Sequence, residues 1–418
     1  MPATASHAHV RQYIASSWHK TVRTTPDDPT HVRVPLPFTV PAIEGSFQEL
    51  YYWDIYFTNR GLLPDGLLEL ARQNADNMLH LVDTHGFMPN GTRTAYLTRS
   101  QLPWLMMIVL DIFKVTGDRA WLRRAARSLR REYDTFTHGP HLAGSTGLSC
   151  CFDWEDNREV LLSTYPGYAA RVGLPPHLPE ELQIEYARHS RAECACWDYT
   201  PRFGDRCLNY APVDLNALLY SYEKGFAEIA QHLDEPAEID WPGRAEQRRT
   251  ALDRHCWNEA RGIYLDYDFV HGRQSEVASL ATFQPLWAKM CDPSKAARIR
   301  ASLPLFERAA GLAACETVEL AGRSYQWGYP NGWAPLQLIA VEGLANYGHY
   351  TDAERVAEKF LATVSGVYRD TGKLWEKYNV IDGSLRTASE YGTPELLGWT
   401  AGVFVALEEF MRSRHSPG

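Results

Sequence analysis

Apolar residues recur every three to four positions through most of the chain, which is the period of an α-helix with one buried face. From Leu67 to Val82 they share one face, and Gly86 follows at a position that suits a helix end. Residues 104–117 are apolar nearly all round, which predicts a buried inner helix. The same periodicity predicts helices near 213–233, 333–347, 351–366 and 395–413.

Two kinds of helix alternate along the chain. The segment after residue 118 places Trp121, Leu129 and Tyr133 on one face and arginines on the other, unlike the apolar segment before it. Strand signals are few, and residues 262–269 predict one arm of a short β-hairpin. The alternation predicts an all-α toroid of helical hairpins, with an inner ring inside an outer ring and a site built by loops at one end. No Pro-, Gly- or Ser-rich linker divides the chain, so we expect one domain over residues 1–418.

Charge and hydropathy indicate which kinds of binding partner the protein is not expected to have. The net charge is −9, and no basic run is present, which argues against nucleic acid or an anionic membrane as partner. The sequence contains no stretch of eighteen apolar residues, so no membrane span is predicted. The first twenty residues lack the apolar core of a secretory signal, so we expect a cytoplasmic location. The sequence makes no prediction of oligomeric state.

Eight cysteines are present, and several lie close together in the sequence. Cys150 and Cys151 are adjacent, Cys194 and Cys196 are separated by one residue, and Cys207 follows. A metal site is one interpretation, but neither a CxxC pair nor a His-x3-His pair accompanies them. We therefore expect reduced thiols in a cytosolic core and no metal.

Several segments between helices mix aromatic rings with planar polar groups and acids. The stretch FQELYYWDIYF, residues 47–57, holds six aromatics together with Glu49 and Asp54. Sugars require this mixture, because their C–H faces stack on rings while their hydroxyls need donors and acceptors. Cleavage of a glycosidic bond requires two carboxyl groups. Acids paired with arginine in structural networks give a similar composition, so composition alone leaves both interpretations open.

Motifs in a fixed order identify a family. They are SFQELYYWDIYFTNRGL (46–62), FMPNGTRTAYLTRSQ (87–101), ECACWDYTPR (193–202), YAPVDLNALLY (210–220), QWGYPNGWAPLQ (326–337), WEKYN (375–379) and SEYG with GWTAG (389–392 and 398–402). Together they resemble the signatures of the α,α-trehalase family of glycoside hydrolases. The resemblance runs from about residue 10 to residue 412. It implies an (α/α)6 barrel and an inverting hydrolysis that uses neither a metal nor an organic cofactor.

The resemblance also implies the catalytic pair. The general acid falls on Asp198 and the general base on Glu376. An inverting pair leaves room for a water molecule, so the two carboxyls are expected roughly 6.5–9.5 Å apart. Two structural alternatives remain: Asp198 paired with Arg202, and Glu376 as a helix-start or surface residue beside Lys377. We expect the Lys377 side chain itself to point away from Glu376.

The resemblance implies a sugar-binding set on two walls of a cleft. Its members are Phe47, Tyr52, Trp53, Asp54, Asn90, Arg99, Gln101, Trp197, Gln326, Trp327 and Glu390. Trp53 and Asp54 are expected to hold the sugar that is cleaved, with Arg99 well suited to contact two hydroxyls at once. The alternatives are a 47–57 segment packed into the core and an ordinary salt bridge for Arg99.

Several family positions differ here. Ser46 replaces an arginine, Gly328 an aspartate, Cys196 a glycine and Asn379 an aspartate. These differences spare both catalytic positions and fall on groups that contact sugar. The substrate is therefore expected to be trehalose or another small α-glycoside with a changed leaving-group subsite. A non-catalytic sugar-binding descendant is the alternative from another class. A phosphorylase is disfavoured, because Glu376 would repel the phosphate.

Overall fold

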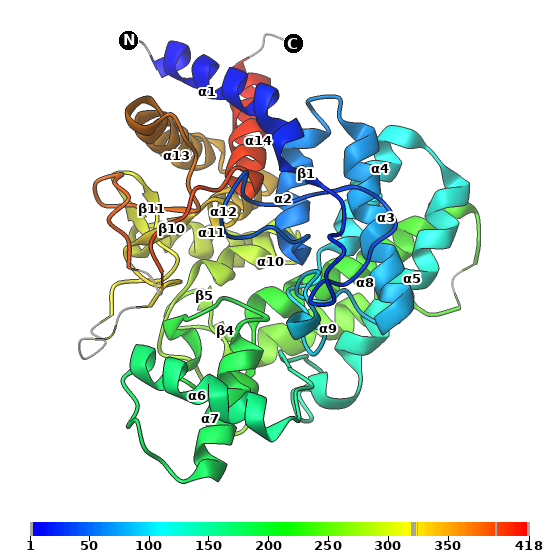
Figure 1. Cartoon of the computed structure of the whole chain (residues 1–418), viewed down its shortest axis with the longest axis vertical. Coiled ribbons are helices and arrows are strands. Elements are labelled where there is room, and N and C mark those ends of the chain that lie inside the picture. The colour runs from blue at the N-terminus through cyan, green and yellow to red at the C-terminus, as the bar shows by residue number, and fades with distance from the viewer. Residues whose placement is uncertain (1–2, 237, 319–322, 324, 389–390, 416–418) are drawn as a thin grey trace.

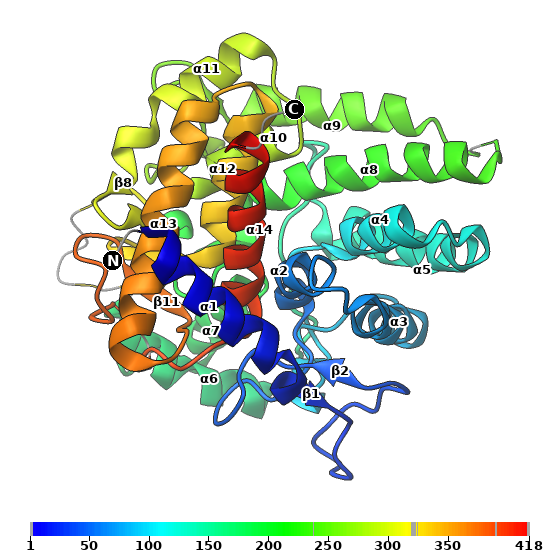
Figure 2. The same cartoon turned by 90° about the horizontal axis from the view of Figure 1, so that it is seen from above.

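The computed structural model describes residues 3–236, 238–318, 323, 325–388 and 391–415 (Figure 1). Its helices form two concentric rings (Figure 2). The inner ring is formed by α2 (Tyr52–Leu62), α4 (Leu105–Thr116), α8 (Val213–Leu233), the short helices η6 (Leu280–Phe283) and α10 (Gln284–Trp287), α12 (Ala334–Asn346) and α14 (Gly398–His415). Each inner member contacts the next, and α14 contacts α2, so the ring closes.

Six further helices lie outside this ring. They are α1 (Ala3–Ser17), α3 (Leu68–His85), α5 (Arg119–Thr137), α9 (Trp241–His255), α11 (Pro293–Ala301) and α13 (Tyr350–Thr371). Outer α5 packs on α4 and α8, and outer α13 packs on α12 and α14. The sequence pattern explains this layering, because α4 is buried nearly all round while α5 buries only one face. The predicted (α/α)6 barrel is confirmed; the prediction of one domain stays a prediction.

Two glycines bring the first and last inner helices into contact. A Cβ on Gly402 of α14 would overlap the carbonyl oxygen of Phe57 in α2, and a Cβ on Gly61 would lie 2.9 Å from the Cα of Gly402. Only glycine therefore allows α2 and α14 to approach this closely. This contact closes the ring between segments that lie near the two ends of the sequence.

Helices α6 (Arg158–Val172) and α7 (Glu180–Glu193) pack on each other and form an arm at the lower edge of Figure 1. The arm has a small apolar cluster of its own, in which Tyr168 and Val172 meet Tyr325. Partly buried Tyr199 packs against this cluster. The arm therefore contacts the barrel through residues that neighbour Asp198 and Gln326 in the sequence.

Short connecting elements complete the fold. The 3-10 helices are η1 (Trp18–Thr21), η2 (Thr94–Tyr96), η3 (Gly139–His141), η4 (Pro201–Phe203), η5 (Cys207–Asn209) and η7 (Leu303–Leu305). The strands pair antiparallel: β1 (Val22–Arg23) with β2 (Phe38–Thr39), β6 (Tyr267–Asp268) with both β3 (Tyr210–Ala211) and β7 (Arg273–Gln274), β4 (Trp257–Asn258) with β5 (Ile263–Tyr264), β8 (Glu307–Arg308) with β9 (Gly311–Leu312), and β10 (Asn331–Trp333) with β11 (Lys377–Asn379). The segment 262–269, expected to form one arm of a hairpin, is instead divided into β5 and β6, which belong to different sheets: β5 pairs with β4, and β6 with β3 and β7. The β10–β11 pair joins two segments that carry predicted site residues.

None of the described helices combines the length and the apolar character needed to cross a bilayer.

Candidate active site

A cavity of about 150 Å³ is lined by residues from six separate segments of the chain. These are Phe47, Tyr51, Trp53, Asp54, Asn90, Tyr96, Arg99, Gln101, Cys194, Cys196, Asp198, Gln326, Trp327, Trp333, Glu376, Tyr391, Leu396 and Trp399. The segments lead into α2, α4, α8, α12 and α14, or form the first turns of these helices. The cavity therefore lies at the N-terminal ends of the inner helices.

Ten of the thirteen residues predicted from the sequence line this cavity, including both predicted catalytic acids. Trp197 is buried and does not line the cavity, and Glu390 lies outside the described residues. Tyr52 is not among the lining residues: it is fully buried, and its hydroxyl accepts a hydrogen bond from Leu105 N (3.1 Å) and lies 3.4 Å from the hydroxyl of Tyr222. Tyr52 begins helix α2, so its side chain faces the helix interface, whereas the next two side chains along the helix face the cavity.

Trp197 and Arg202 support the cavity from behind. The guanidinium of Arg202 is fully buried and donates to Asp214 (2.8 and 2.9 Å) and to Asp266 (2.7 and 2.9 Å). The Trp197 ring lies between this guanidinium, at 4.2 Å, and the Trp327 ring, at 5.5 Å between centroids. Arg202 is thus satisfied by two other acids, and the alternative in which it pairs with Asp198 is not observed.

Asp198 faces the cavity from the segment that follows α7. Its Oδ1 accepts a hydrogen bond from the thiol of Cys194 at 2.9 Å. Burial raises the pKa of the Asp198 carboxyl, while the Cys194 hydrogen bond and the positive charges of Arg99 and Arg171 oppose that rise. A carboxyl with a raised pKa remains protonated at a higher pH and is able to donate a proton.

Glu376 is buried and held by donors on both carboxylate oxygens. Tyr391 donates to Oε1 at 2.7 Å, and Lys377 donates to Oε2. Burial raises the pKa of Glu376, whereas Lys377 and Tyr391 lower it. The expectation that Lys377 points away is wrong: the Lys377 side chain is fully buried, and an ammonium in that position requires the neighbouring carboxylate. The alternatives for Glu376 are also wrong, because Glu376 is buried and lies directly before strand β11 rather than at a helix start.

Asp54 is a third acid in the cavity. Burial, and secondarily the charge of Glu376, raises the pKa of Asp54 to about 8. Asp54 therefore carries a proton through the neutral range and offers a donor as well as an acceptor to a ligand.

Four tryptophans form an apolar wall of the cavity. The rings of Trp327 and Trp333 stack with centroids 3.7 Å apart, and Trp53 lies 5.3 Å from Trp327. Trp399 meets Trp53 and Trp333 edge-on at 5.9 and 5.8 Å. The wall presents flat apolar faces beside the carboxyls, the combination that a pyranose ring requires.

Polar residues before α4 also line the cavity. Arg99 lies 3.5 Å from Asp153, and the Tyr96 ring lies 5.2 Å from its guanidinium. Gln101 accepts a hydrogen bond from Trp53 N at 3.1 Å through Oε1, which fixes its amide. Arg99 thus forms the salt bridge of the alternative interpretation and lines the cavity as well.

Eight lining residues were absent from the predicted set. They are Tyr51, Tyr96, Cys194, Cys196, Trp333, Tyr391, Leu396 and Trp399. All of them except Leu396 lie inside the quoted motifs, so adjacency to a predicted residue is the available signal. Cys194 and Cys196 were interpreted as core thiols, because cysteine carries no sequence signal for a sugar site.

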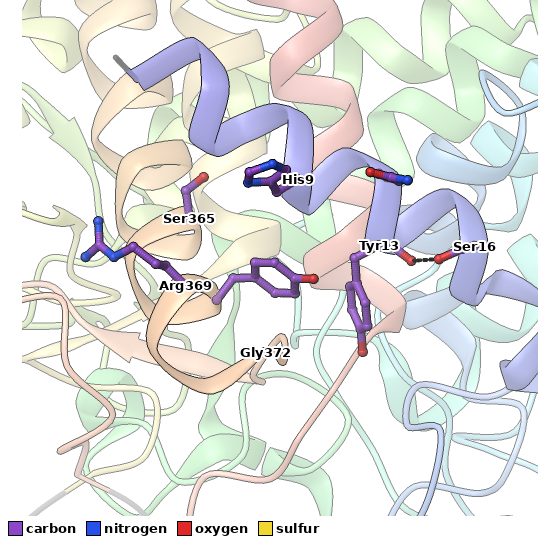
Figure 3. A pocket seen from close by; sticks show the side chains of 8 residues that line it. His9, Tyr13, Ser16, Ser365, Arg369 and Gly372 are labelled. Atoms are coloured by element: carbon purple, nitrogen blue, oxygen red, sulfur yellow. Dashed lines mark hydrogen bonds between the residues drawn. The ribbon is translucent and has the colours of Figure 1, made fainter. Parts of the chain in front are cut away.

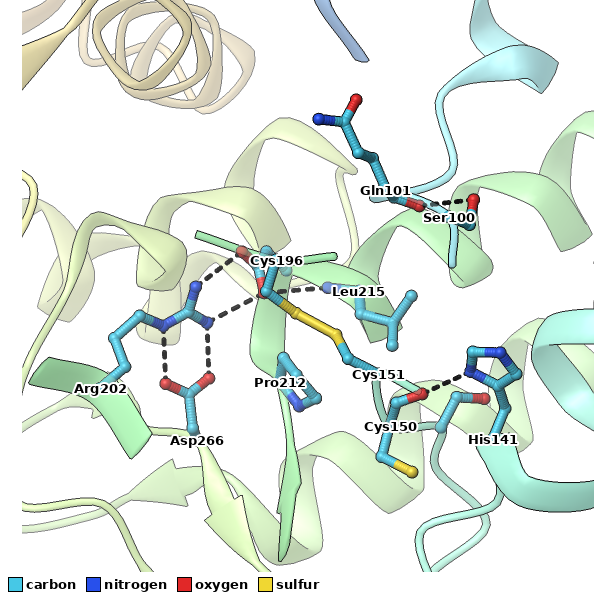
Figure 4. Close-up of a disulfide and its surroundings, with 12 residues drawn as sticks. Ser100, Gln101, His141, Cys150, Cys151, Cys196, Arg202, Pro212, Leu215 and Asp266 are labelled. Atoms are coloured by element: carbon cyan, nitrogen blue, oxygen red, sulfur yellow. Dashed lines mark hydrogen bonds and ion pairs between the residues drawn. A yellow bond between two sulfur atoms is a disulfide. The ribbon is translucent and has the colours of Figure 1, made fainter. Parts of the chain in front are cut away.

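A disulfide lies beside the cavity. Cys151 and Cys196 are bonded to each other, as Figure 4 shows, so the expectation of reduced thiols is wrong for these two. The sulfur of Cys207 is close to this bond, with all three sulfur atoms within 4.8 Å of one another. The bond joins the segment that carries Asp198 to the loop that precedes α6.

A larger hollow of about 640 Å³ lies between α1 and α13 (Figure 3). His9, Tyr13 and Ser16 line it from α1, and Ser365, Tyr368 and Arg369 line it from α13. No carboxylate is among its described lining residues. It therefore lacks the groups that glycoside cleavage requires.

Known proteins resemble this chain in sequence and in fold. The model of the Trehalase family matches residues 3–160 and 177–411. The chain belongs to the trehalase family. A periplasmic trehalase from Xanthomonas campestris pv. campestris is 34% identical over 421 residues, covering 95% of this chain and 72% of the relative. As a member of this family the chain is a glycoside hydrolase.

Solved structures agree with this family assignment. The neutral trehalase of Saccharomyces cerevisiae superposes with a TM-score of 0.77 at 28% identity, covering 97% of this chain and 80% of that one. A mannosylglycerate hydrolase from Thermus thermophilus has a TM-score of 0.67 at 18% identity, covering 96% and 100% of the two chains, and supports the fold alone. The family match omits residues 161–176, which include most of α6.

The expected cytoplasmic location is contradicted. Relatives from several bacterial species carry the name periplasmic trehalase. Residues 3–17, which belong to the segment on which the expectation depended, form α1 and lie in the matched region. They are part of the folded barrel and carry no information about export.

Proposed function

We propose that this trehalase-family protein hydrolyses the α-glucosidic bond of trehalose, or of a closely similar small α-glycoside, with inversion at the anomeric carbon. Asp198 acts as general acid and Glu376 as general base. The observation that carries the proposal is that these two acids, remote in the sequence, line one tryptophan-walled cavity. The relatives named trehalase support trehalose as the first substrate to test.

The different environments of the two acids support their roles. Glu376 accepts hydrogen bonds from an ammonium and from a phenol, both of which favour its ionised form. Within the described part of the chain, Asp198 accepts a side-chain hydrogen bond from the Cys194 thiol, and burial favours its neutral form. The ionised Glu376 takes a proton from water as that water attacks the anomeric carbon. Asp198 gives its proton to the leaving oxygen as the glycosidic bond breaks.

Other residues hold the sugar. The Trp53, Trp327 and Trp399 rings provide stacking faces, and Arg99, Gln101, Asn90, Asp54 and Gln326 provide hydrogen-bonding groups. Cys196, where the family has glycine, lines this cavity, and Gly328, where the family has aspartate, directly follows the lining residue Trp327. A Cβ on Gly328 would lie 3.2 Å from the Cβ of Tyr325, so the local turn has little space for a larger residue. Discrimination among α-glycosides is therefore expected to differ from that of the family.

A periplasmic site of action is part of this proposal. The names of the bacterial relatives support it. The Cys151–Cys196 disulfide agrees with it, because such bonds persist in oxidising compartments such as the periplasm.

The test is sugar release from trehalose and a panel of small α-glycosides. Asp198→Asn and Glu376→Gln are each expected to lower kcat by about a thousandfold. Glu395→Gln is the matched control: Glu395 comes from the same region but pairs with Lys373 at 2.5 Å and does not line the cavity. Full activity in both acid variants would reject the pair. Binding without release of any sugar would favour the non-catalytic alternative, and a requirement for added phosphate would favour a phosphorylase.

A further inference from the structure

The thiol of Cys194 faces the carboxyl of Asp198 inside the cavity. Its sulfur lies 2.9 Å from Oδ1 of Asp198, and both residues are among those that line the cavity. Burial raises the pKa of the Cys194 thiol well above its ordinary value, so the sulfur keeps its hydrogen and acts as a donor. A protonated thiol is a weak nucleophile, which leaves hydrogen bonding as its available chemistry.

The backbone fixes the thiol in this position. Helix α7 ends at Glu193, and Cys194 donates its N–H to the Ser190 carbonyl at 3.3 Å. On the far side of Asp198, Thr200 donates its N–H to the Glu193 carboxylate at 2.7 Å. Between these two points the Cys196 disulfide anchors the segment to residue 151. The segment 193–200 is therefore closed on itself, and the thiol and carboxyl are held facing one another.

We propose that Cys194 is a positioning residue for Asp198: its thiol holds Oδ1 as an acceptor, so that Oδ2 carries the proton that passes to the leaving oxygen. The inference rests on the proposed role of Asp198 as general acid. When the proton leaves Oδ2, the glycosidic bond breaks and the carboxylate that forms keeps the thiol hydrogen bond. A hydrogen bond to an ionised acceptor is stronger than one to a neutral acceptor, so the thiol favours the state reached after transfer.

Other charged groups also act on Asp198. Arg99 reaches it from the segment before α4 and Arg171 from α6, and both lower its pKa. Two acids interact with it as well: Glu193 at the end of α7, and Glu376 across the cavity. Substitution of Cys194 leaves these four groups in place, so a change in the pH profile reports the thiol alone.

The experiment compares Cys194→Ala with Cys194→Ser. Loss of the donor in Cys194→Ala raises the pKa of Asp198, so the basic limb of kcat/KM should move to higher pH while kcat falls about tenfold. KM is expected to change less than kcat, because the hydrogen bond orients the acid rather than the sugar. Cys194→Ser retains a hydroxyl donor, so kcat should recover and the basic limb should return to its original pH or lower.

Three outcomes would overturn this role while Asp198→Asn is inactive. They are an unchanged kcat and pH profile in Cys194→Ala, a loss of kcat that serine fails to rescue, and a loss that comes with no movement of the basic limb. If Cys194→Ala does not fold, the profile of Cys194→Ser decides alone, and a basic limb at higher pH rejects the role. Full activity in Asp198→Asn would instead reject the proposed function itself, so the two failures are distinguishable.

Discussion

The hydroxyl of Tyr391 donates a 2.7 Å hydrogen bond to Oε1 of Glu376. The two residues are fifteen positions apart, and both line the cavity. Together with Lys377 on the other oxygen, this contact keeps an ionised carboxylate in a buried place. The environment of Glu376 therefore suits a base that accepts a proton from water.

The first prediction concerns this contact. Tyr391→Phe removes a donor to the ionised carboxylate, so the pKa of Glu376 should rise and the acidic limb of kcat/KM should move to higher pH. A hydrogen bond to a charged group is worth about 1.5–3 kcal/mol, so a loss of at least about tenfold in kcat/KM is expected on that limb. The measurement is a pH series with the proposed substrate. Tyr368→Phe on α13 is the control, and an acidic limb that moves equally in both variants would contradict the argument.

The second prediction concerns closure of the ring. Gly402→Ala places a methyl group against the Phe57 carbonyl, so α2 and α14 must separate. Overpacking of this kind costs about 1–3 kcal/mol or more. The matched control is Gly366→Ala in α13, where nothing lies within 4 Å of the added atom. That variant should gain up to about 1 kcal/mol from helix propensity. Urea unfolding of both variants measures the difference, and equal stabilities would refute the close-packing argument.

The third prediction concerns pH and stability. Burial raises the pKa of Glu132 to about 7, and Tyr222 donates to its carboxylate. The folded state therefore binds the proton more tightly than the unfolded state. The resulting stabilisation is complete below the ordinary glutamate pKa and is lost as pH rises to about 7, a change of roughly 3 kcal/mol.

Glu132→Gln isolates this contribution, because it keeps the shape of the side chain and removes its titration. As pH rises from about 4.5 to about 7, the native protein should lose stability relative to the variant, so the variant's free energy of unfolding should increase relative to that of the native protein. Chemical denaturation at several pH values measures it. A difference that is constant across this range would show that Glu132 does not titrate in the folded state.

The fourth prediction concerns the disulfide. The Cys151–Cys196 bond joins residues 45 positions apart, and a loop of this length stabilises by roughly 4 kcal/mol in the chain-entropy model. A reductant should therefore lower the unfolding midpoint of the native protein and leave the Cys151→Ser/Cys196→Ser variant unchanged. A thiol titration of the unfolded, unreduced protein should find six free thiols out of eight. Eight free thiols would contradict the bond.

Sequence pattern predicted the barrel because inner and outer helices bury different fractions of their surfaces. The apolar α4 and the arginine-backed α5 are distinguishable by periodicity alone. The family motifs predicted the cavity well, because most of them lie in segments that lead into inner helices. Tyr52 escaped this reasoning, since a one-residue step around the start of α2 turns a side chain from the cavity into the helix interface.

The direction of individual side chains and the pairing of cysteines were harder to predict. The direction of the Lys377 side chain depends on burial, which sequence does not give, so its contact with Glu376 was missed. The disulfide was missed because cysteine pairing depends on the folding of the α6–α7 arm between residues 151 and 196. The location was missed because the first residues of the sequence belong to the barrel.

The stereochemistry of the first turnover tests the catalytic pair most directly. In the proposed mechanism, water held by Glu376 attacks the face opposite the bond that Asp198 protonates, so trehalose should release equal amounts of α- and β-glucose before the anomers equilibrate. Proton NMR of the freshly formed product resolves these anomers. Release of α-glucose alone would mean retention, and the two acids could not then act as an inverting acid and base.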